Sequence, residues 1–569
     1  MEKFLLKLEV SRKQAYIFSS KRLRDNAARS AEIDFVTGHL TRLQQRDFFK
    51  EAAGDLYDRA ENLVYTGGGH AVLQFDDEEQ ATAFARRVTK AAMERFHGME
   101  LFVKCFRYDE NILGDERPPA FLRKTGAANL RALSRQLAEK KALRRNAVGQ
   151  ISFGVEKLNR HTFQPEPLEN EWAESLEESV KEPDGCAYPS QIEHLCGEDN
   201  FMAVVHIDGN GMGTRVNEIY NQESETDWDG LRKELDDFSK TVDAAFKSAF
   251  RRTAEQVAAY LAKNPETLNH TPKASLSNDP PPADALPIRP VILAGDDVCF
   301  VTMGNIGLEC ARLFLENLIN PENGKGYYAC AGVALVHRKY PFHKAYKLAD
   351  ELCSNAKKLV AEIREKEQKL GVSAMDWHIE FGQLRGDLDE IRRAYDTEDR
   401  DKQGKPRRME LRPVVLLAGD EDEKDASKRV DIDSGVCGEI TGGVRTYDYF
   451  KALCQAMWGE YGQTARGKIK DLRTAFKQGE VESRYFLRSR EVSHLLDQAF
   501  PAKYRTKAEQ WNQFKDISDN GEKVFSGKTA SFRGEAFKDV NRVSRCLFFD
   551  AVEMIDHFTA LETREEAET

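Results

Sequence analysis

Two adjacent aspartates, Asp296 and Asp297, interrupt an otherwise apolar stretch, VILAGDDVCFVT (residues 291–302). Two neighbouring carboxylates are costly inside an apolar strand, because like charges repel and burial penalises the ionised form. The pair therefore lies either at a turn in contact with water or beside a cation that neutralises it. The plain alternative is a type I′ hairpin, in which Asp and Gly are simply good turn residues.

A third carboxylate, Asp208, follows the apolar run FMAVVHI and precedes a glycine-rich turn. In a small ferredoxin-like sheet the hairpin between the second and third strands lies beside the end of the first strand. We therefore expect Asp208, Asp296 and Asp297 to converge as catalytic and metal-binding residues. Mg²⁺ suits such oxygen ligands and leaves sites open for phosphate oxygens. Two metal ions there would activate a ribose 3′-hydroxyl and stabilise a leaving pyrophosphate.

The loop DGNGMG, which begins at Asp208, exposes backbone N–H groups and leads into a predicted helix. Such a helix start can hold a triphosphate, although an isolated DGNG is more often an ordinary loop. Together with the aspartates, the loop predicts a site for a nucleotide and a metal. The residues expected to hold the nucleotide are Gly209, Asn210, Gly211, Met212 and Gly213.

The elements that must position these residues occur twice. Residues 1–110 show the order strand, helix, two strands, helix, strand, which is that of a ferredoxin-like unit. The same order returns in residues 201–395, with an additional helix and strand. The hairpin carries GGGH in the first unit and AGDD in the second. The predicted fold class is α+β, with two ferredoxin-like units.

Two further regions complete the predicted organisation. Residues 111–200 form a charged linker or insert domain, and residues 396–569 form a mainly helical C-terminal domain. Residues 440–550 carry 20 Lys and Arg against 14 Asp and Glu, so this region is locally basic in a chain of net charge −11. It is either a helical bundle with a solvated charged face or a surface for RNA or an RNA-bound partner.

Composition excludes some classes of protein. No segment approaches the roughly 20 apolar residues that a membrane span needs, and the first residues lack a signal-peptide pattern, so we expect a cytoplasmic protein without membrane contact. None of the ten cysteines forms a CxxC pair. Cys186, His194 and Cys196 could belong to a zinc site, but a fourth ligand is not in view.

The second unit resembles the polymerase/cyclase palm domain of the large subunit of type III CRISPR effector complexes. The resemblance is strong over 201–390, fair over 1–105 and loose elsewhere, and the order palm, linker, palm, helical domain also matches. The matching stretches of the second palm are HIDGNGMG, LPIRPVILAGDDVCFVT and YYACAGVALVHRKYPFHKAYKLADELCSNAKK, and those of the first are LEVSRKQAYIFSSKRLRDNAARSAEIDF and YTGGGHAVLQF.

This resemblance implies an enzyme that binds ATP with Mg²⁺ or Mn²⁺ and joins AMP units through 3′–5′ bonds. Its product would be a cyclic oligoadenylate, a second messenger of antiviral defence. The implied partners are other type III subunits, guide RNA and an activating target RNA. In the first palm, Gly67, Gly68 and Gly69 would let a second ATP approach the face between the palms, unless they form only a tight turn.

The chain departs from the family pattern in three places. In the linker, the cysteine pairs common in relatives are reduced to Cys186 and Cys196, which argues against a zinc ribbon. Many members carry an N-terminal HD nuclease domain, whereas this sequence opens at the first palm, so we expect no metal-dependent DNase activity. The usual Gly-Gly-Asp-Asp turn has Ala294 in place of its first glycine. Alanine is tolerated there if the residue keeps a negative φ, so we expect activity to be retained.

Two other functions stay open. The chain could be a non-catalytic scaffold whose palms only organise guide RNA and neighbouring subunits, or a free-standing cyclic-nucleotide synthase. The intact aspartates favour the two enzymatic alternatives, and the basic C-terminal region favours a ribonucleoprotein. A diguanylate-type cyclase is less favoured, because those enzymes have a longer acidic-aromatic turn.

Overall fold

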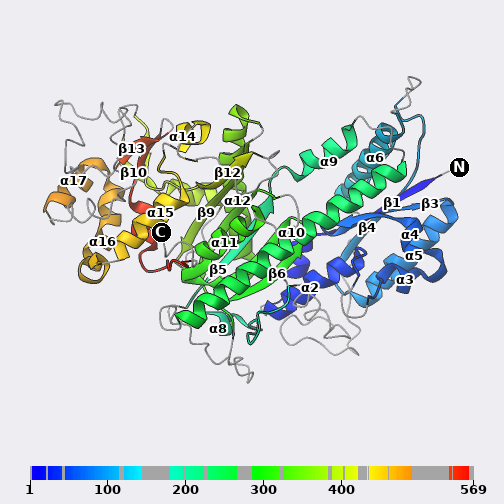
Figure 1. The fold of residues 1–569 in the computed structure, drawn as a ribbon, viewed down its shortest axis with the longest axis horizontal. Coiled ribbons are helices and arrows are strands. Elements are labelled where there is room, and N and C mark those ends of the chain that lie inside the picture. Colours follow the sequence, from blue (N-terminus) through cyan, green and yellow to red (C-terminus); the bar gives the residue numbers. More distant parts are fainter. Residues whose placement is uncertain are drawn as a thin grey trace.

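The fold contains three β-sheets with helices on their faces, so the predicted α+β class is confirmed (Figure 1). The division into four domains stays a prediction. The computed structural model describes residues 3–18, 20, 23–40, 45–113, 121–143, 180–196, 200–222, 228–264, 285–319, 326–368, 370–381, 387–400, 404–420, 432, 435–441, 443–458, 460–489, 537–540 and 543–562.

The first sheet has the strand order β2-β3-β1-β4, with antiparallel neighbours throughout. This is the order of a ferredoxin-like unit. Its strands are β1 (Phe4–Ser11), β2 (Leu63–Gly67), β3 (His70–Phe75) and β4 (Glu100–Arg107). The helices between them are α1 (Lys13–Ile17), α2 (Leu23–Val36), α3 (Phe48–Ala53), α4 (Arg59–Asn62) and α5 (Glu78–Arg95), with a short 3₁₀ turn, η1 (Gly54–Leu56).

The second sheet repeats this order and then extends it. Its strands run β12-β9-β8-β5-β7-β6, so β6-β7-β5-β8 matches the first sheet and β9 and β12 are added at one edge. β9 joins β8 in parallel through a helical crossover, and β12 joins β9 antiparallel. The strands are β5 (Phe201–Gly209), β6 (Ile288–Ala294), β7 (Asp297–Met303), β8 (Ala329–His337), β9 (Leu370–Glu380) and β12 (Val414–Asp420).

Helices cover both faces of the second sheet. Alternate residues of a strand point to opposite faces. Gly332 of β8 lies under α12 (Phe342–Lys366), whereas the next residue, Val333, lies near Gly307 at the start of α11 (Gly307–Ile319). A Cβ at Gly332 would lie 1.9 Å from the carbonyl oxygen of Ala349, so glycine allows α12 to pack directly on the strand.

The long helix α10 (Trp228–Lys263) runs across both units (Figure 1). Its first turns bury Trp228 and Leu231 in an apolar cluster with Leu5 and Val72 of the first sheet, whereas Phe250 further along belongs to the main core. α6 (Phe121–Leu143) and α9 (Met212–Asn221) also pack against this region. Part of the predicted linker therefore covers the first sheet.

The C-terminal region contains strands as well as the predicted helices, and the sequence did not indicate these strands. β12 extends the second sheet, and four short strands form a third sheet of order β10-β11-β14-β13. Several of these strands are polar, for example DTEDR in β10, so alternation of apolar residues did not reveal them. Its strands are β10 (Asp396–Arg400), β11 (Pro406–Arg408), β13 (Phe537–Val540) and β14 (Val543–Cys546).

The remaining elements are helices. Among the described residues, no helix is long and apolar enough to cross a membrane. Most of the cations after residue 489 in the basic region lie outside the described residues. The helices not yet placed are α8 (Ile192–Leu195), α13 (Leu388–Arg393), α14 (Gly435–Thr441), α15 (Tyr447–Trp458), α16 (Glu460–Gln478), α17 (Glu480–Ser489) and α20 (Phe549–Met554), with a 3₁₀ turn, η2 (Gly304–Ile306).

Candidate active site

The three aspartates predicted from the sequence lie at one edge of the second sheet. Asp208, near the end of β5, is the register partner of Asp297, the first residue of β7. Asp296 occupies the β6–β7 turn, and its carbonyl oxygen accepts a hydrogen bond from the backbone N–H of Gly209 at 3.2 Å. Gly295 has φ +67°, a conformation that only glycine adopts readily, and this explains the glycine before the two aspartates.

The proximity of the carboxylates changes how they ionise. Burial, and then the charges of Asp208 and Asp297, raise the pKa of Asp296 to about 6. Burial alone would also raise the pKa of Asp297, but the hydrogen bond and charge of His206, with smaller contributions from Lys13 and Lys357, lower it. One aspartate is therefore held as an anion while its neighbour resists ionisation.

His206 lies two residues before Asp208, so both side chains are on the same face of β5. The imidazole is buried, and its Nε2 donates to Oδ1 of Asp297 at 3.1 Å. Its Nδ1 lies 3.5 Å from Oδ1 of Asp350 on α12. Burial opposes the charged imidazolium, but Asp297, Asp350 and Asp208 outweigh this effect and raise the pKa of His206. His206 thus lies between two carboxylates that both favour its charged form.

Helix α12 presents three charged residues at seven-residue spacing, which places Asp350, Lys357 and Arg364 on one helix face. Lys357 Nζ lies 2.6 Å from Oδ2 of Asp208 and donates to the carbonyl oxygen of Gly209 at 3.3 Å. The Nη1 atom of Arg364 would lie 3.3 Å from a Cβ built at Gly211. Two cations therefore border the glycine-rich loop.

The predicted nucleotide loop connects β5 to α9. Gly211 caps the N-terminus of α9, which begins at Met212. Asn210 is buried, and its Nδ2 donates to the carbonyl oxygen of Val372 at 2.8 Å. Its side chain therefore fixes the loop to β9. A Cβ at Gly213 would have no heavy atom within 4 Å, so this end of the loop is open.

The glycine turn of the first sheet faces the aspartate turn of the second. A Cβ built at Gly295 would lie 4.0 Å from the backbone nitrogen of Gly68. α10 lies beside both turns, because Ser239 donates to the carbonyl oxygen of Thr66 at 2.5 Å and Asp243 accepts from the N–H of Gly295 at 3.4 Å.

The flanking glycines of this turn contact other side chains. Lys13 Nζ donates to the carbonyl oxygen of Gly68. A Cβ at Gly67 would lie 2.6 Å from Oγ of Ser239, and a Cβ at Gly69 would lie 2.8 Å from Cδ of Lys13. Close packing on Ser239 therefore accounts for glycine at position 67, whereas Gly69 has φ +76°, a conformation that favours glycine.

Sequence reasoning missed four charged residues of this site: His206, Asp350, Lys357 and Arg364. The signals for them were present, since the first shares a strand face with Asp208 and the other three recur every seven residues on one helix. What the sequence did not indicate was which face of α12 meets the end of β5.

The predicted metal ligands were tested against the geometry. Within the part of the chain that the structure describes, no three His, Cys, Asp or Glu side chains form a metal-binding group, at the aspartates or at Cys186 and Cys196. Asp208 is instead paired with Lys357, and Asp297 with His206. The donor chemistry nevertheless suits Mg²⁺, because three carboxylates raise the local negative charge at a partly exposed edge.

Comparisons with known proteins give structural neighbours only: no family model and no curated protein matches the sequence. A crystal structure of the Csm1-Csm4 cassette in complex with cA4 is similar, at 16% identity and a TM-score of 0.39, over 63% of this chain and 53% of that chain. The cassette in complex with one ATP gives 15% identity and a TM-score of 0.39, with the same shares covered.

A third neighbour is the Csm1-Csm4 subcomplex of the type III-A CRISPR-Csm interference complex. It shows 14% identity and a TM-score of 0.37, over 63% of this chain and 53% of that chain. The chain thus spans about half the length of these neighbours.

Proposed function

We propose that the second palm is a nucleotidyltransferase that converts ATP into cyclic oligoadenylates. The observation that carries this proposal is the meeting of Asp208, Asp296 and Asp297 at the sheet edge, beside the glycine-rich start of α9. The family resemblance of the motifs supports adenine nucleotides as substrate and a type III CRISPR complex, with guide RNA and activating target RNA, as the setting.

The residues of the site would divide the chemistry among them. The three aspartates would hold Mg²⁺ or Mn²⁺, which when bound would activate the attacking 3′-hydroxyl and stabilise the leaving pyrophosphate. Lys357 and Arg364 add positive charge beside the loop, where a triphosphate would bind. His206 would keep Asp297 ionised. Gly67, Gly68 and Gly69 of the facing turn would border a second ATP.

The ion pairs of the site also supply the argument for the alternative. Lys357 and His206 already neutralise Asp208 and Asp297, as expected of a scaffold whose palms no longer bind metal. In the catalytic proposal Mg²⁺ competes with Lys357 for Asp208. The two proposals therefore differ in whether metal and nucleotide bind at this edge.

The decisive experiment incubates the purified full chain with labelled ATP and Mg²⁺ or Mn²⁺, with and without its copurified RNA and subunits. We expect the wild type to form oligoadenylates, identified as cyclic or linear by mass spectrometry, and the Asp296→Ala/Asp297→Ala variant to form none.

The matched control is Asp236→Ala/Asp237→Ala, which removes an adjacent aspartate pair of α10, one half-buried and one exposed. It should keep full activity. If neither the wild type nor the control makes a product while both are folded, the result favours the non-catalytic scaffold. A product made without RNA would identify a free-standing synthase.

A further inference from the structure

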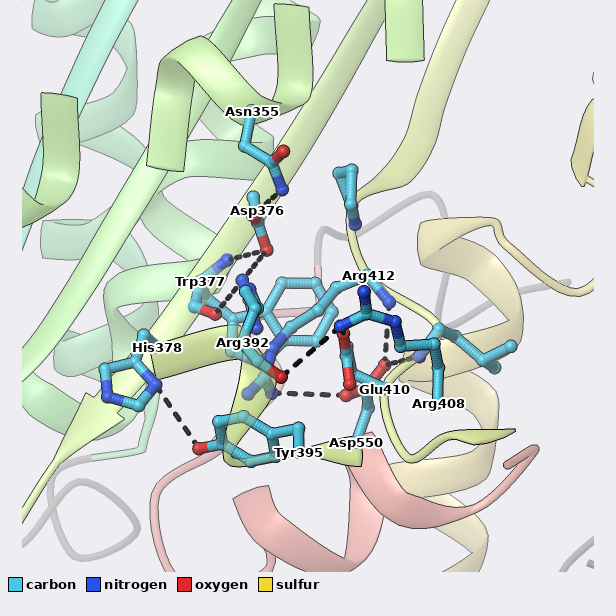
Figure 2. Close-up of polar contacts among 12 residues, drawn as sticks. Asn355, Asp376, Trp377, His378, Arg392, Tyr395, Arg408, Glu410, Arg412 and Asp550 are labelled. Carbon is cyan, nitrogen blue, oxygen red and sulfur yellow. Dashed lines mark hydrogen bonds and ion pairs between the residues drawn. The ribbon is translucent and has the colours of Figure 1, made fainter. Parts of the chain in front are cut away.

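A cavity of about 510 Å³ lies away from the aspartates, between α12, the segment that precedes β12, and β14. Figure 2 shows much of its surroundings, with arginines from several elements pointing toward one another. Six cationic and three acidic side chains line it. The cationic residues are Lys358, Arg392, Arg408, Arg412, Arg445 and Arg545, and the acidic residues are Glu362, Asp389 and Glu410.

Two of the arginines use part of their hydrogen-bonding capacity in ion pairs. Arg392 donates to Asp376 at 2.5 Å (Figure 2). Arg412 Nη1 donates to Asp550 at 3.1 Å and to Glu553 at 2.6 Å. These contacts hold the guanidinium groups in fixed positions around the cavity.

Several guanidinium nitrogens of the lining arginines have no hydrogen-bond partner among the described residues. Nε and Nη1 of Arg392, Nε and Nη2 of Arg412, and Nε of Arg545 are buried and have no hydrogen-bond partner among the described residues. Arg392 and Arg412 are only 8% and 1% exposed. Buried donors are normally satisfied, so five unpaired guanidinium nitrogens beside one cavity show that this cluster has more donors than acceptors among the described residues.

Two other arginines of the cavity, Arg445 and Arg545, donate to uncharged backbone carbonyl oxygens. Arg445 donates from Nε to the carbonyl oxygens of Leu411 and Pro413, at 2.9 and 3.3 Å, and Arg545 donates to the carbonyl oxygen of Glu410 at 2.7 Å. Burial and the charge of Arg545 lower the pKa of Arg445 to about 9. A bound anion would stabilise the charged form of both arginines.

We propose that this cavity binds the phosphate group of a nucleotide or oligonucleotide. Guanidinium groups bind phosphate oxygens in pairs, and five arginines and one lysine line this cavity. The volume falls in the range of small-molecule sites and exceeds that needed for a lone inorganic ion. The alternative is a cavity in which ordered water molecules satisfy the arginines.

The test measures binding by calorimetry to the full-length Asp296→Ala/Asp297→Ala chain without divalent metal, so that the aspartate edge does not contribute. The probes are AMP, adenosine, inorganic phosphate, and one RNA oligonucleotide with either a 5′-phosphate or a 5′-hydroxyl. We expect AMP or the RNA to bind and adenosine to bind at least about tenfold more weakly, because it lacks the charged acceptor. AMP binding alone identifies a free nucleotide, and tighter binding of the 5′-phosphorylated RNA identifies an RNA end.

Two variants locate the binding. Arg445→Gln should weaken it about 10- to 100-fold, the effect of losing a charge-assisted hydrogen bond. Lys358→Glu changes an exposed residue of the rim and should weaken binding without affecting folding. Lys344→Glu reverses an exposed charge on the same helix outside the cavity and should bind like the parent.

Adenosine binding equal to that of AMP, absence of binding by every phosphate probe, or binding unchanged by Lys358→Glu and Arg445→Gln would each overturn the proposal. Circular dichroism of every variant separates lost binding from lost folding. The proposal does not depend on catalysis by the second palm.

Discussion

The two palm sheets share one strand order but differ in charge at equivalent positions. In the first sheet, Glu9 near the end of β1 faces His70 of β3, and in the second, Asp208 faces Asp297. Both carboxylates on the first strand pair with a lysine from a helix that packs on the sheet. The distances are 2.5 Å for Glu9–Lys141 and 2.6 Å for Asp208–Lys357.

The difference lies in the hairpin turn. Burial and nearby lysines lower the pKa of His70 to about 3, so its imidazole is neutral, whereas Asp297 is held as an anion. The turn of the first sheet, GGGH, therefore carries no carboxylate, whereas the turn of the second, AGDD, carries two. The comparison teaches that strand order places the hairpin turn beside the end of the first strand, while two or three turn residues decide whether carboxylates gather there.

The largest effect should come from equivalent substitutions at the two edges. Asp297→Asn removes a proposed metal ligand, so ATP turnover should fall by more than the 10- to 100-fold typical of an outer-shell change. Glu9→Gln removes the matching charge of the first sheet and should leave turnover within about twofold. Turnover is measured with labelled ATP at several Mg²⁺ concentrations. Equal losses in both variants would show that the two edges do not differ in function.

A smaller effect is expected at His206, which hydrogen-bonds to Asp297. His206→Leu should weaken the apparent Mg²⁺ affinity by about 10- to 100-fold, as does loss of other outer-shell partners. Turnover at saturating Mg²⁺ should recover most of its value, because the metal ligands remain. His206→Gln keeps a donor and should restore part of the affinity. A turnover defect that no Mg²⁺ concentration relieves would place His206 in the reaction itself.

The pH dependence tests the electrostatics of the turn. The pKa of Asp296 is raised to about 6, so protons occupy this carboxylate below that pH and oppose metal binding. Activity should therefore rise with pH and level off above about 6. Because Mg²⁺ competes with the proton, higher Mg²⁺ should move this acidic limb to lower pH. An acidic limb that is insensitive to Mg²⁺ would assign it to another group.

Much of this arrangement was predictable from sequence. Apolar runs separated by glycine turns indicated both β-α-β-β-α-β patterns, and their order implied that Asp208 meets the β6–β7 turn. The polar strands β10 and β11 were not predictable, because β11 pairs with β14, far away in the chain. The position of Lys357 was not predictable, because it depends on which face of α12 packs on the sheet. The arginine cavity was not predictable either, because its cations come from separate elements.

The smallest effect should come from restoring the usual glycine of the turn. Ala294 is not among the residues of positive φ, so alanine is unstrained there, as the sequence interpretation required. Ala294→Gly should lower the free energy of unfolding by about 0.5–1 kcal/mol, because glycine adds backbone freedom to the unfolded chain. Activity should change less than about twofold, because the aspartates do not move. Chemical denaturation measures the change in stability and ATP turnover measures the change in activity. Gly295→Ala is the strained counterpart, because Gly295 has φ +67°. It should lower the free energy of unfolding by about 1–2 kcal/mol. A large gain of activity in Ala294→Gly would mean that alanine restrains the turn, and would make the second palm a partly disabled enzyme.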